Sequence, residues 1–171
     1  MLKKELLVIG AGPAGLAAAI EAAKGGVKDM LVVDLNMKPG GQLFKQIHKF
    51  FGSKAHRAGV RGIDIGTQML QEAKELGIEI WLNTACVGFF DDKMACLEKG
   101  KEDGTTEIVY MKADKIIIAT GGQENVVRFK GWTTPGVMGA GAAQTMINVN
   151  KVQPGQRIVM QIGRASCRER V

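Results

Sequence analysis

A glycine-rich turn near the N-terminus constrains the fold of this chain more than any other feature. Residues 5–9 are apolar and predict a strand, and the Ala-rich residues 13–24 predict a helix. A second apolar segment, residues 30–33, ends at Asp34. The turn between the first strand and the helix reads Gly10, Ala11, Gly12, Pro13, Ala14 and Gly15. A GxGxxG turn in this position is the pattern of a βαβ unit that binds a dinucleotide.

Each residue type in the turn has a physical reason. Gly10 permits the tight turn, Gly12 lets the backbone approach a pyrophosphate, and Gly15 lets the helix pack close to the strand. Pro13 stands near the first helical position, where a missing N–H costs nothing. The free N–H groups at the start of the helix, from Ala14 onward, then face the phosphates.

Asp34 is the candidate ligand for the adenosine ribose. It closes the second strand 19 residues after Gly15. A carboxylate in that position accepts hydrogen bonds from the ribose hydroxyls. An aspartate that only stabilises a turn is the alternative, but the position after the second strand favours the ligand role.

The remaining pattern predicts an α/β fold. We expect a Rossmann-type parallel sheet with helices on both faces and an inserted three-stranded β meander before the last core strand. The further elements predicted are a helix over residues 64–76, a strand over 79–82, meander strands over 86–90, 93–97 and 106–111, and a strand over 115–119.

Composition excludes several classes of protein. Hydrophobic residues make up 46% and charged residues 23%, which is an ordinary globular balance. The net charge of +6 falls to +4 without residues 162–171, too mild to indicate nucleic acid binding. The three cysteines lack metal-ligand spacing with the histidines, so we expect no metal site and a reducing, cytoplasmic location. The glycine-punctuated apolar run over residues 6–20 is too short for a membrane span.

The last residues differ in character from the rest. Residues 157–160 predict a new buried strand after a turn, whereas residues 161–171 show neither strand alternation nor a helical apolar stripe. The string IGRASCRERV is the translation of a common sequencing-library adapter, ATC GGA AGA GCG TCG TGT AGG GAA AGA GTG. We expect residues 161–171 to be a non-native tail derived from that adapter, the alternative being a genuine basic tail.

Three features in order resemble the two-dinucleotide flavoprotein family. They are the segment Pro39-Gly40-Gly41-Gln42-Leu43, the predicted meander, and the segment Ile116-Ile117-Ile118-Ala119-Thr120-Gly121. The resemblance implies that the first Rossmann unit holds FAD. It further implies that Gly41 and Gln42 run beside the flavin and that Thr120 and Gly121 lie beneath the cofactor. Val87 is a weaker candidate for a backbone contact to adenine.

Residues 131–144 resemble one branch of that family: the alpha subunit of sarcosine oxidase, hydrogen cyanide synthase, and opine or dye-linked proline dehydrogenases. The resemblance implies oxidation of an amine or amino acid, often within a hetero-oligomer. Neither the segment after Gly41 nor the segment after Gly121 carries a cysteine pair, so no dithiol relay is expected. Gly139 to Gln144 is interpreted as a helix start rather than a second nucleotide loop, since no apolar strand precedes it.

The predicted organisation is an FAD-binding domain over residues 1–125, followed by a connection and the first strand of a truncated NAD(P)-binding domain over 126–160. NAD(P) is expected only in the full-length protein. The resemblance makes the chain part of an FAD-dependent oxidoreductase with a small-molecule substrate. The chain alone is expected to bind FAD weakly or not at all, because half of the pocket is lacking, and to be inactive. No catalytic acid or base is assigned. The alternatives are an enzyme similar to thioredoxin reductase and a non-catalytic nucleotide-binding or assembly subunit.

A basic, aromatic segment over residues 38–61 allows several interpretations. It carries six lysine and arginine residues and no acid. An anionic substrate or partner surface is one hypothesis, and a solvated loop is the other. Phe44, Phe50 and Phe51 fit either nucleic acid stacking or apolar anchoring of the loop, and anchoring is favoured.

Overall fold

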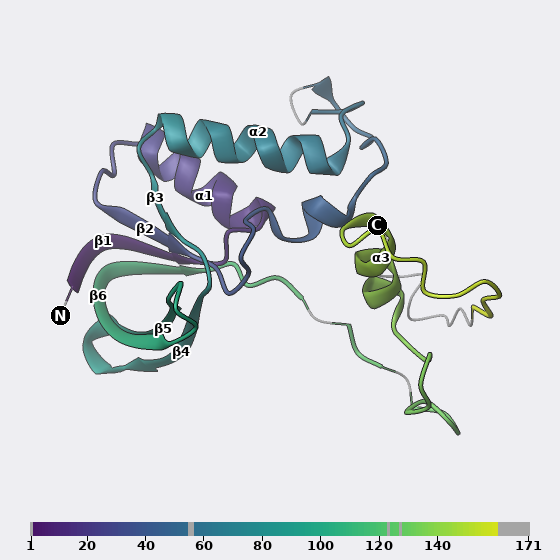
Figure 1. Ribbon diagram of the computed structural model, residues 1–171. Coiled ribbons are helices and arrows are strands. Elements are labelled where there is room, and N and C mark those ends of the chain that lie inside the picture. The colour runs from purple at the N-terminus through teal and green to yellow at the C-terminus, as the bar shows by residue number, and fades with distance from the viewer. Residues whose placement is uncertain (1, 55–56, 123, 127, 161–171) are drawn as a thin grey trace. The chain divides into compact units, whose positions relative to one another are not determined.

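The computed structural model describes residues 2–54, 57–122, 124–126 and 128–160 (Figure 1). The chain forms two compact units that divide between Glu124 and Asn125. The predicted boundary, between residues 125 and 126, lies one residue further along. The expected adapter-derived tail, residues 161–171, lies outside the described residues.

One six-stranded sheet, in the order β3-β2-β1-β6-β5-β4, forms the first unit. The first three strands and the second half of β6 are parallel, while β4, β5 and the first half of β6 are antiparallel. This is the predicted α/β fold with an inserted meander. The strands are β1 (Leu2–Ile9), β2 (Met30–Val33), β3 (Glu79–Trp81), β4 (Thr84–Phe90), β5 (Met94–Gly100) and β6 (Thr106–Ile118).

β6 is one continuous strand where the sequence predicted two. Residues 106–112 pair with β5, and residues 111–118 pair with β1. The prediction left a break over residues 112–114, which include the charged Lys112 and Asp114. In the structure Ala113 between them is 1% exposed, so side chains alternate between core and solvent and the strand continues. β6 therefore joins the parallel sheet to the meander without a turn.

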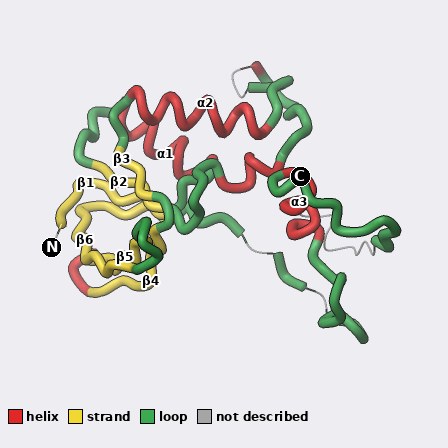
Figure 2. Tube along the Cα trace, in the orientation of Figure 1, coloured by secondary structure: helices red, strands yellow, loops and turns green. Residues whose placement is uncertain are grey.

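Both helices of the first unit pack on one face of the sheet, as Figure 2 shows. α1 (Pro13–Lys24) has the predicted bounds, and α2 (Gly62–Glu75) begins two residues earlier than predicted. Among the described residues of this unit no helix lies on the other face, so the expectation of helices on both faces was wrong for this part of the chain. The opposite face is covered by the meander, whose Ala95, Leu97 and Met111 pack against β1 and β2. A curled sheet that covers its own second face needs no helix there.

The two cores follow from the alternation of side chains along β1. Leu6 and Val8 point into the core beneath α1 and α2, and Leu7 and Ile9 point into the core beneath the meander. All four are at most 6% exposed. A strand that is buried on both sides has to be apolar throughout, which is why residues 6–9 form an unbroken apolar run.

The loop between β2 and α2 is more ordered than the sequence predicted. It contains the 3₁₀ helix η1 (Gly41–Lys45), and Lys49 forms an antiparallel bridge with Arg61. The short turn η3 (Asp91–Lys93), in which Asp92 and Lys93 have positive φ, connects β4 to β5. Glu72 of α2 binds Lys24 of α1 at 2.9 Å and Arg57 of the loop at 3.0 Å, so one carboxylate ties three segments together. The hydrogen bond from Lys24 is the largest cause that lowers the pKa of Glu72.

The second unit contains the helix α3 (Ala140–Asn148), which begins where the sequence predicted a helix start. Residues 157–160 form no strand, and Ile158, Val159 and Met160 are exposed. Among the described residues of this unit no strand is present for them to pair with, and a lone strand leaves its backbone groups unsatisfied. The assignment of 126–160 to a truncated NAD(P)-binding domain stays a prediction.

A polar network closes the amino-terminal end of the parallel strands. Lys4 of β1 binds Asp29 at 2.8 Å and Glu79 at 3.0 Å. Glu79 also accepts a hydrogen bond from Trp81 Nε1. The Lys99 ammonium lies over the Trp81 ring, 3.8 Å from its centroid, in a cation–π contact. Burial alone would raise the pKa of Glu79, but the hydrogen bonds from Lys4 and Trp81 lower it.

Replacing Lys4 tests this network. We expect Lys4→Met to lower the free energy of unfolding at neutral pH by about 1 kcal/mol, because both acidic partners lose their cation. Lys3→Met is the matched control, since Lys3 lies 3.5 Å from an exposed Asp114, and its effect should stay within about 0.5 kcal/mol. Urea unfolding measures both.

The effect of Lys4→Met should depend on pH. Because the pKa of Glu79 is lowered by folding, its contribution is present above its ordinary pKa and is lost as the pH falls through the folded pKa. The gap between wild type and Lys4→Met should therefore narrow in acid. A gap that is constant with pH would show that the carboxylates contribute nothing.

Candidate nucleotide-binding site

The carboxyl ends of β1, β2 and β6 meet beside the start of α1, near the centre of Figure 1. The glycine-rich turn lies at this edge. Its first N–H, on Gly10, donates to the Val33 carbonyl at 2.7 Å, and the Ala119 N–H donates to the Ile9 carbonyl at 2.7 Å. The ends of three neighbouring strands are thus tied together at the turn. The carboxyl edge of a parallel sheet is where such folds bind ligands.

Two glycines of the turn have no room for a side chain. Gly10 has φ +108°, and a Cβ there would overlap the Ala119 carbonyl oxygen. A Cβ on Gly15 would overlap the Gly10 carbonyl oxygen and lie 3.3 Å from a methyl of Val8. These are the roles that the motif predicts for its first and third glycines, a tight turn and a close helix–strand approach.

Gly12 is different, because its surroundings are open. A Cβ there would have only the Gly41 Cα within reach, at 4.0 Å, and the Gly12 backbone is extended, with φ −76°. Packing inside the chain therefore does not require glycine at this position. An unfilled space above the start of a helix fits the approach of a phosphate.

The segment Gly40-Gly41-Gln42 begins against the glycine-rich turn, and its expected place beside a flavin stays a prediction. Gly40 has φ +106°, and its N–H donates to the Ala11 carbonyl at 2.7 Å. A Cβ on Gly41 would lie 3.0 Å from Gly12 Cα, so the two backbones are in near contact. Gln42 is the second residue of η1 and is exposed. The structure thus brings together two motifs that are about 30 residues apart in the sequence.

Asp34 stands at the end of β2 with its carboxylate turned toward the turn. Its Oδ2 accepts a hydrogen bond from the Ala11 N–H at 2.7 Å. Its Oδ1 accepts from the backbone N–H and the side-chain amide of Asn36, both at 2.8 Å. Asp34 is only 8% exposed. Asp34 therefore lies at the turn, and its predicted role as the ribose ligand stays a prediction.

Two residues that lie near Asp34 in the fold were not predicted from the sequence. Asn36 binds the Asp34 carboxylate, and its carbonyl accepts a hydrogen bond from the Asn83 N–H at 3.1 Å. Asn83 has φ +48° and accepts from the Gly100 N–H at 2.8 Å. The sequence signal was an Asp-x-Asn triplet, typical of side chains that bond to a nearby backbone.

Beside this chain of contacts lies a hollow of about 310 Å³. It is lined by Leu35, Asn83, Ala85, Glu98, Gly100, Lys101, Gly104, Thr105 and Thr106. A larger hollow of about 690 Å³ is lined by Leu2, Trp81, Met94, Lys99, Glu107, Ile108, Val109 and Tyr110, none of which is a predicted site residue. We relate the smaller one to the site, because Leu35 follows Asp34 in the sequence and the Asn83 N–H donates to the carbonyl of Asn36, which binds the Asp34 carboxylate.

The remaining predicted residues lie at the edges of the site. Val87 stands in β4 at a bulge, where the register with β5 skips between Cys86 and Gly88, and it is 54% exposed. An extra residue at a bulge is left out of the ladder, which leaves its backbone available to a ligand. Thr120 and Gly121 follow Ala119 and are exposed, with Gly121 at φ +74°. The structure therefore leaves the predicted roles of these three residues as predictions.

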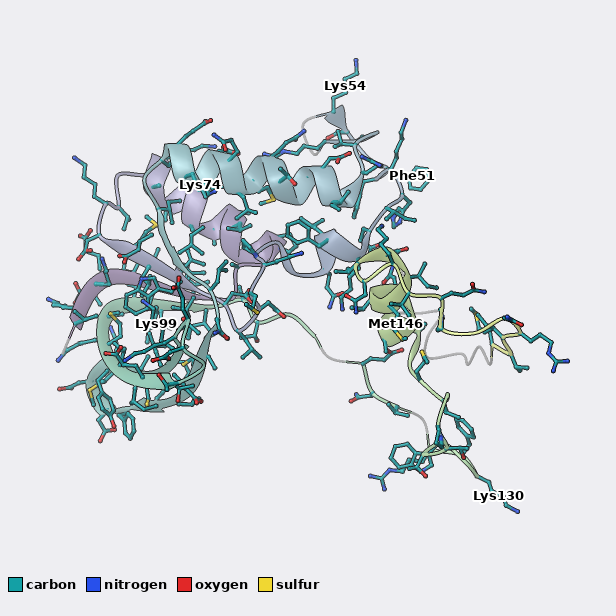
Figure 3. All side chains as sticks on the ribbon, in the orientation of Figure 1. Phe51, Lys54, Lys74, Lys99, Lys130 and Met146 are labelled. Carbon is teal, nitrogen blue, oxygen red and sulfur yellow. The ribbon has the colours of Figure 1, made fainter. Side chains whose placement is uncertain are left out.

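The basic segment before α2 is anchored largely by its own side chains. Phe44 packs against Gly40 and Gly66, and Phe50 stacks on His48 at 5.3 Å between ring centroids. Phe51 is 95% exposed, and Figure 3 shows it and Lys54 pointing outward. Anchoring therefore accounts for two of the three phenylalanines.

The two cysteines of the described residues are free and stand on strands β4 and β5. Burial raises the pKa of the Cys86 thiol, which disfavours its reactive thiolate. Neither cysteine lies in the segment after Gly41 or in α3. Gly139 is the N-cap of α3, and the Ala143 N–H donates to its carbonyl, so this segment forms the predicted helix start. That it is not a second nucleotide loop stays a prediction.

A family model described as pyridine nucleotide-disulphide oxidoreductase matches residues 4–162. The chain belongs to this family. It is 35% identical over 161 residues to an opine oxidase subunit from Agrobacterium tumefaciens, covering 91% of this chain and 31% of that protein. It is 30% identical to the alpha subunit of sarcosine oxidase from Rhizobium meliloti, covering 89% of this chain and 16% of that protein.

The solved structure of L-proline dehydrogenase from P. horikoshii matches with a TM-score of 0.76 at 22% identity, over 91% of this chain and 30% of that one. That likeness confirms the fold. The chain spans less than a third of the length of the two curated relatives. No helix among the described residues has the length and apolar character that crossing a membrane requires.

Substituting Gly10 tests the packing of the turn. We expect Gly10→Ala to lower the free energy of unfolding by about 2 to 4 kcal/mol, since the Cβ overlaps Ala119 and the positive φ is strained. Gly26→Ala is the control, because Gly26 has φ +98° with nothing within 4 Å of its Cβ. Gly26→Ala should lower the free energy of unfolding only through the strain of a positive φ, by about 1 to 2 kcal/mol. Equal losses in urea unfolding would contradict the close approach.

The rate at which Cys86 is alkylated tests whether its thiol is reactive. In a Cys167→Ser variant, we expect iodoacetamide to modify Cys86 of the folded chain more slowly than it modifies free cysteine at about pH 8, because its pKa is raised. Mass spectrometry of the time course measures the rate. Modification at the rate of free cysteine, before unfolding, would indicate an accessible thiolate.

Proposed function

We propose that this chain is the FAD-binding portion of a flavin-dependent oxidoreductase. One observation carries the proposal. The backbone of Gly41 lies against that of Gly12, so that a Cβ on Gly41 would stand only 3.0 Å from the Cα of Gly12. The turn that fits a pyrophosphate and the motif that resembles the flavin-side segment thereby form one site. Membership in the pyridine nucleotide-disulphide oxidoreductase family supports the same conclusion.

The residues present fit the ADP half of FAD. The space left open at Gly12 admits a phosphate beside the start of α1, whose first amides carry a partial positive charge. Asp34 stands at the strand end where a ribose is recognised, next to the hollow lined by Leu35 and Asn83. When bound, FAD supplies hydride transfer through its isoalloxazine ring, and the protein supplies its position and electrostatic surroundings.

We propose an amine or amino acid as the substrate class, and a hetero-oligomer as the assembly. The support is the likeness to proteins named as subunits of opine oxidase and sarcosine oxidase. Binding of NAD(P) is proposed only for the full-length protein, because among the described residues no strand leads into the glycines that begin α3, as a second nucleotide turn would need. The cytoplasmic location stays a prediction.

Dithiol chemistry is the alternative with least support from the described residues. Their two cysteines stand on neighbouring strands of the meander, and neither lies beside Gly41. The non-catalytic nucleotide-binding or assembly subunit stays open. Comparing the flavin spectrum and the oxidation of candidate amines with and without partner subunits would distinguish it from a catalytic chain.

Ligand binding tests the proposal directly. We expect ADP and FAD to bind with affinities within about threefold of each other and FMN to bind at least about tenfold more weakly, because the built part of the site is for the ADP half. Isothermal titration calorimetry on the purified chain measures all three. Binding of FMN as tight as that of FAD, or no binding of ADP, would overturn the proposal.

A substitution at Gly12 sharpens the test. Gly12→Ala should weaken the binding of ADP and FAD by about tenfold or more, or about 1.4 kcal/mol. The free energy of unfolding should stay almost unchanged. The reason is that the added methyl occupies space left for a phosphate and touches only Gly41. Gly155→Ala, at a position with nothing closer than 3.7 Å, is the control and should leave binding unaltered.

A further inference from the structure

The carboxylate of Asp34 is engaged mainly by the chain itself. One oxygen accepts the Ala11 N–H at 2.7 Å, and the other accepts two N–H groups of Asn36 at 2.8 Å. Asp34 is 8% exposed. An aspartate that served only to bind ribose hydroxyls would keep its oxygens toward the ligand. This carboxylate instead uses most of its hydrogen-bonding capacity inside the protein.

Ala11 is held from both sides. Its N–H donates to Asp34, and its carbonyl accepts from the Gly40 N–H at 2.7 Å. The Ala11 residue is fully buried. With both ends of this residue bound, the peptide that leads into Gly12 has a fixed direction, and so do the amides at the start of α1. Orientation of those amides decides how well they meet a phosphate.

Asp34 is in turn fixed to the sheet. Its N–H donates to the Trp81 carbonyl and its carbonyl accepts from Thr84, both at 2.9 Å. Asn36 is fixed through its carbonyl to the Asn83 N–H. The Asp34 backbone is thus held by residues of β3 and β4, and its carboxylate holds Ala11. The position of the glycine-rich turn therefore depends on the positions of these strands.

We propose that Asp34 and Asn36 form a positioning pair for the phosphate-binding turn. Asp34 holds Ala11, and Asn36 orients the Asp34 carboxylate. The affinity of the turn for a pyrophosphate therefore depends on Asp34 even when the ligand has no ribose hydroxyls. This inference rests on the proposed nucleotide site and gives Asp34 a second role within it.

Ligands with and without the ribose hydroxyls separate the two roles. ADP and 2′,3′-dideoxy-ADP are titrated into the wild-type chain and into Asp34→Asn by calorimetry. A positioning role predicts that Asp34→Asn weakens both ligands by a similar factor, about tenfold, because the loss occurs at the turn. If ADP weakens and dideoxy-ADP does not, Asp34 acts on the ribose alone and the proposal is overturned.

Asn36→Ala is the second variant, and it keeps the Asp34 carboxylate. Asn36 is exposed, so the variant should fold, and it should weaken both ligands by a smaller common factor, about threefold. Asp114→Asn, an exposed carboxylate on β6, is the control and should change neither ligand. A result in which Asn36→Ala leaves both affinities unchanged would remove Asn36 from the pair.

A measurement without ligand separates this inference from the proposed function. The Ala11 amide proton should exchange slowly in the ligand-free chain and at least about tenfold faster in Asp34→Asn, as followed by NMR. If the wild type binds neither ADP analogue, the proposed function fails, while unchanged protection of Ala11 in Asp34→Asn would overturn the positioning role by itself.

Discussion

The close approach of backbone to backbone at Gly10 is the constraint on which the rest of this structure depends. Only a residue without a Cβ lets the end of β1 turn beneath the Ala119 carbonyl, and only Gly15 lets α1 descend onto that turn. With these two contacts in place, the helix start points at the carboxyl edge of the sheet. The position of any ligand at this edge therefore follows from the backbone path that Gly10 and Gly15 allow.

The site is a set of backbone contacts supported by few side chains. Gly40 and Asp34 hold Ala11 from opposite sides, and Gly41 lies against Gly12. Amides held in this way are preorganised for a charged group and lose little entropy when it binds.

Much of this could be predicted from the sequence, because the deciding patterns are local. The bounds of α1 and β2 follow from an apolar run, a proline and a glycine pair, and the glycine motif has a fixed meaning between a strand and a helix. The continuity of β6 could not be predicted, since Lys112 and Asp114 conceal a buried Ala113. Asn36 and Asn83 were missed because their roles depend on strands that meet only in the folded chain.

β6 has a consequence for how this unit comes apart. Its first half completes the meander and its second half is the partner of β1, with no turn between them. A pull or a local opening that frees the meander must also strip hydrogen bonds from the strand that carries the nucleotide turn. The meander and the nucleotide edge should accordingly open as one cooperative block, so that a cofactor seated at one end would slow the unravelling of strands at the other.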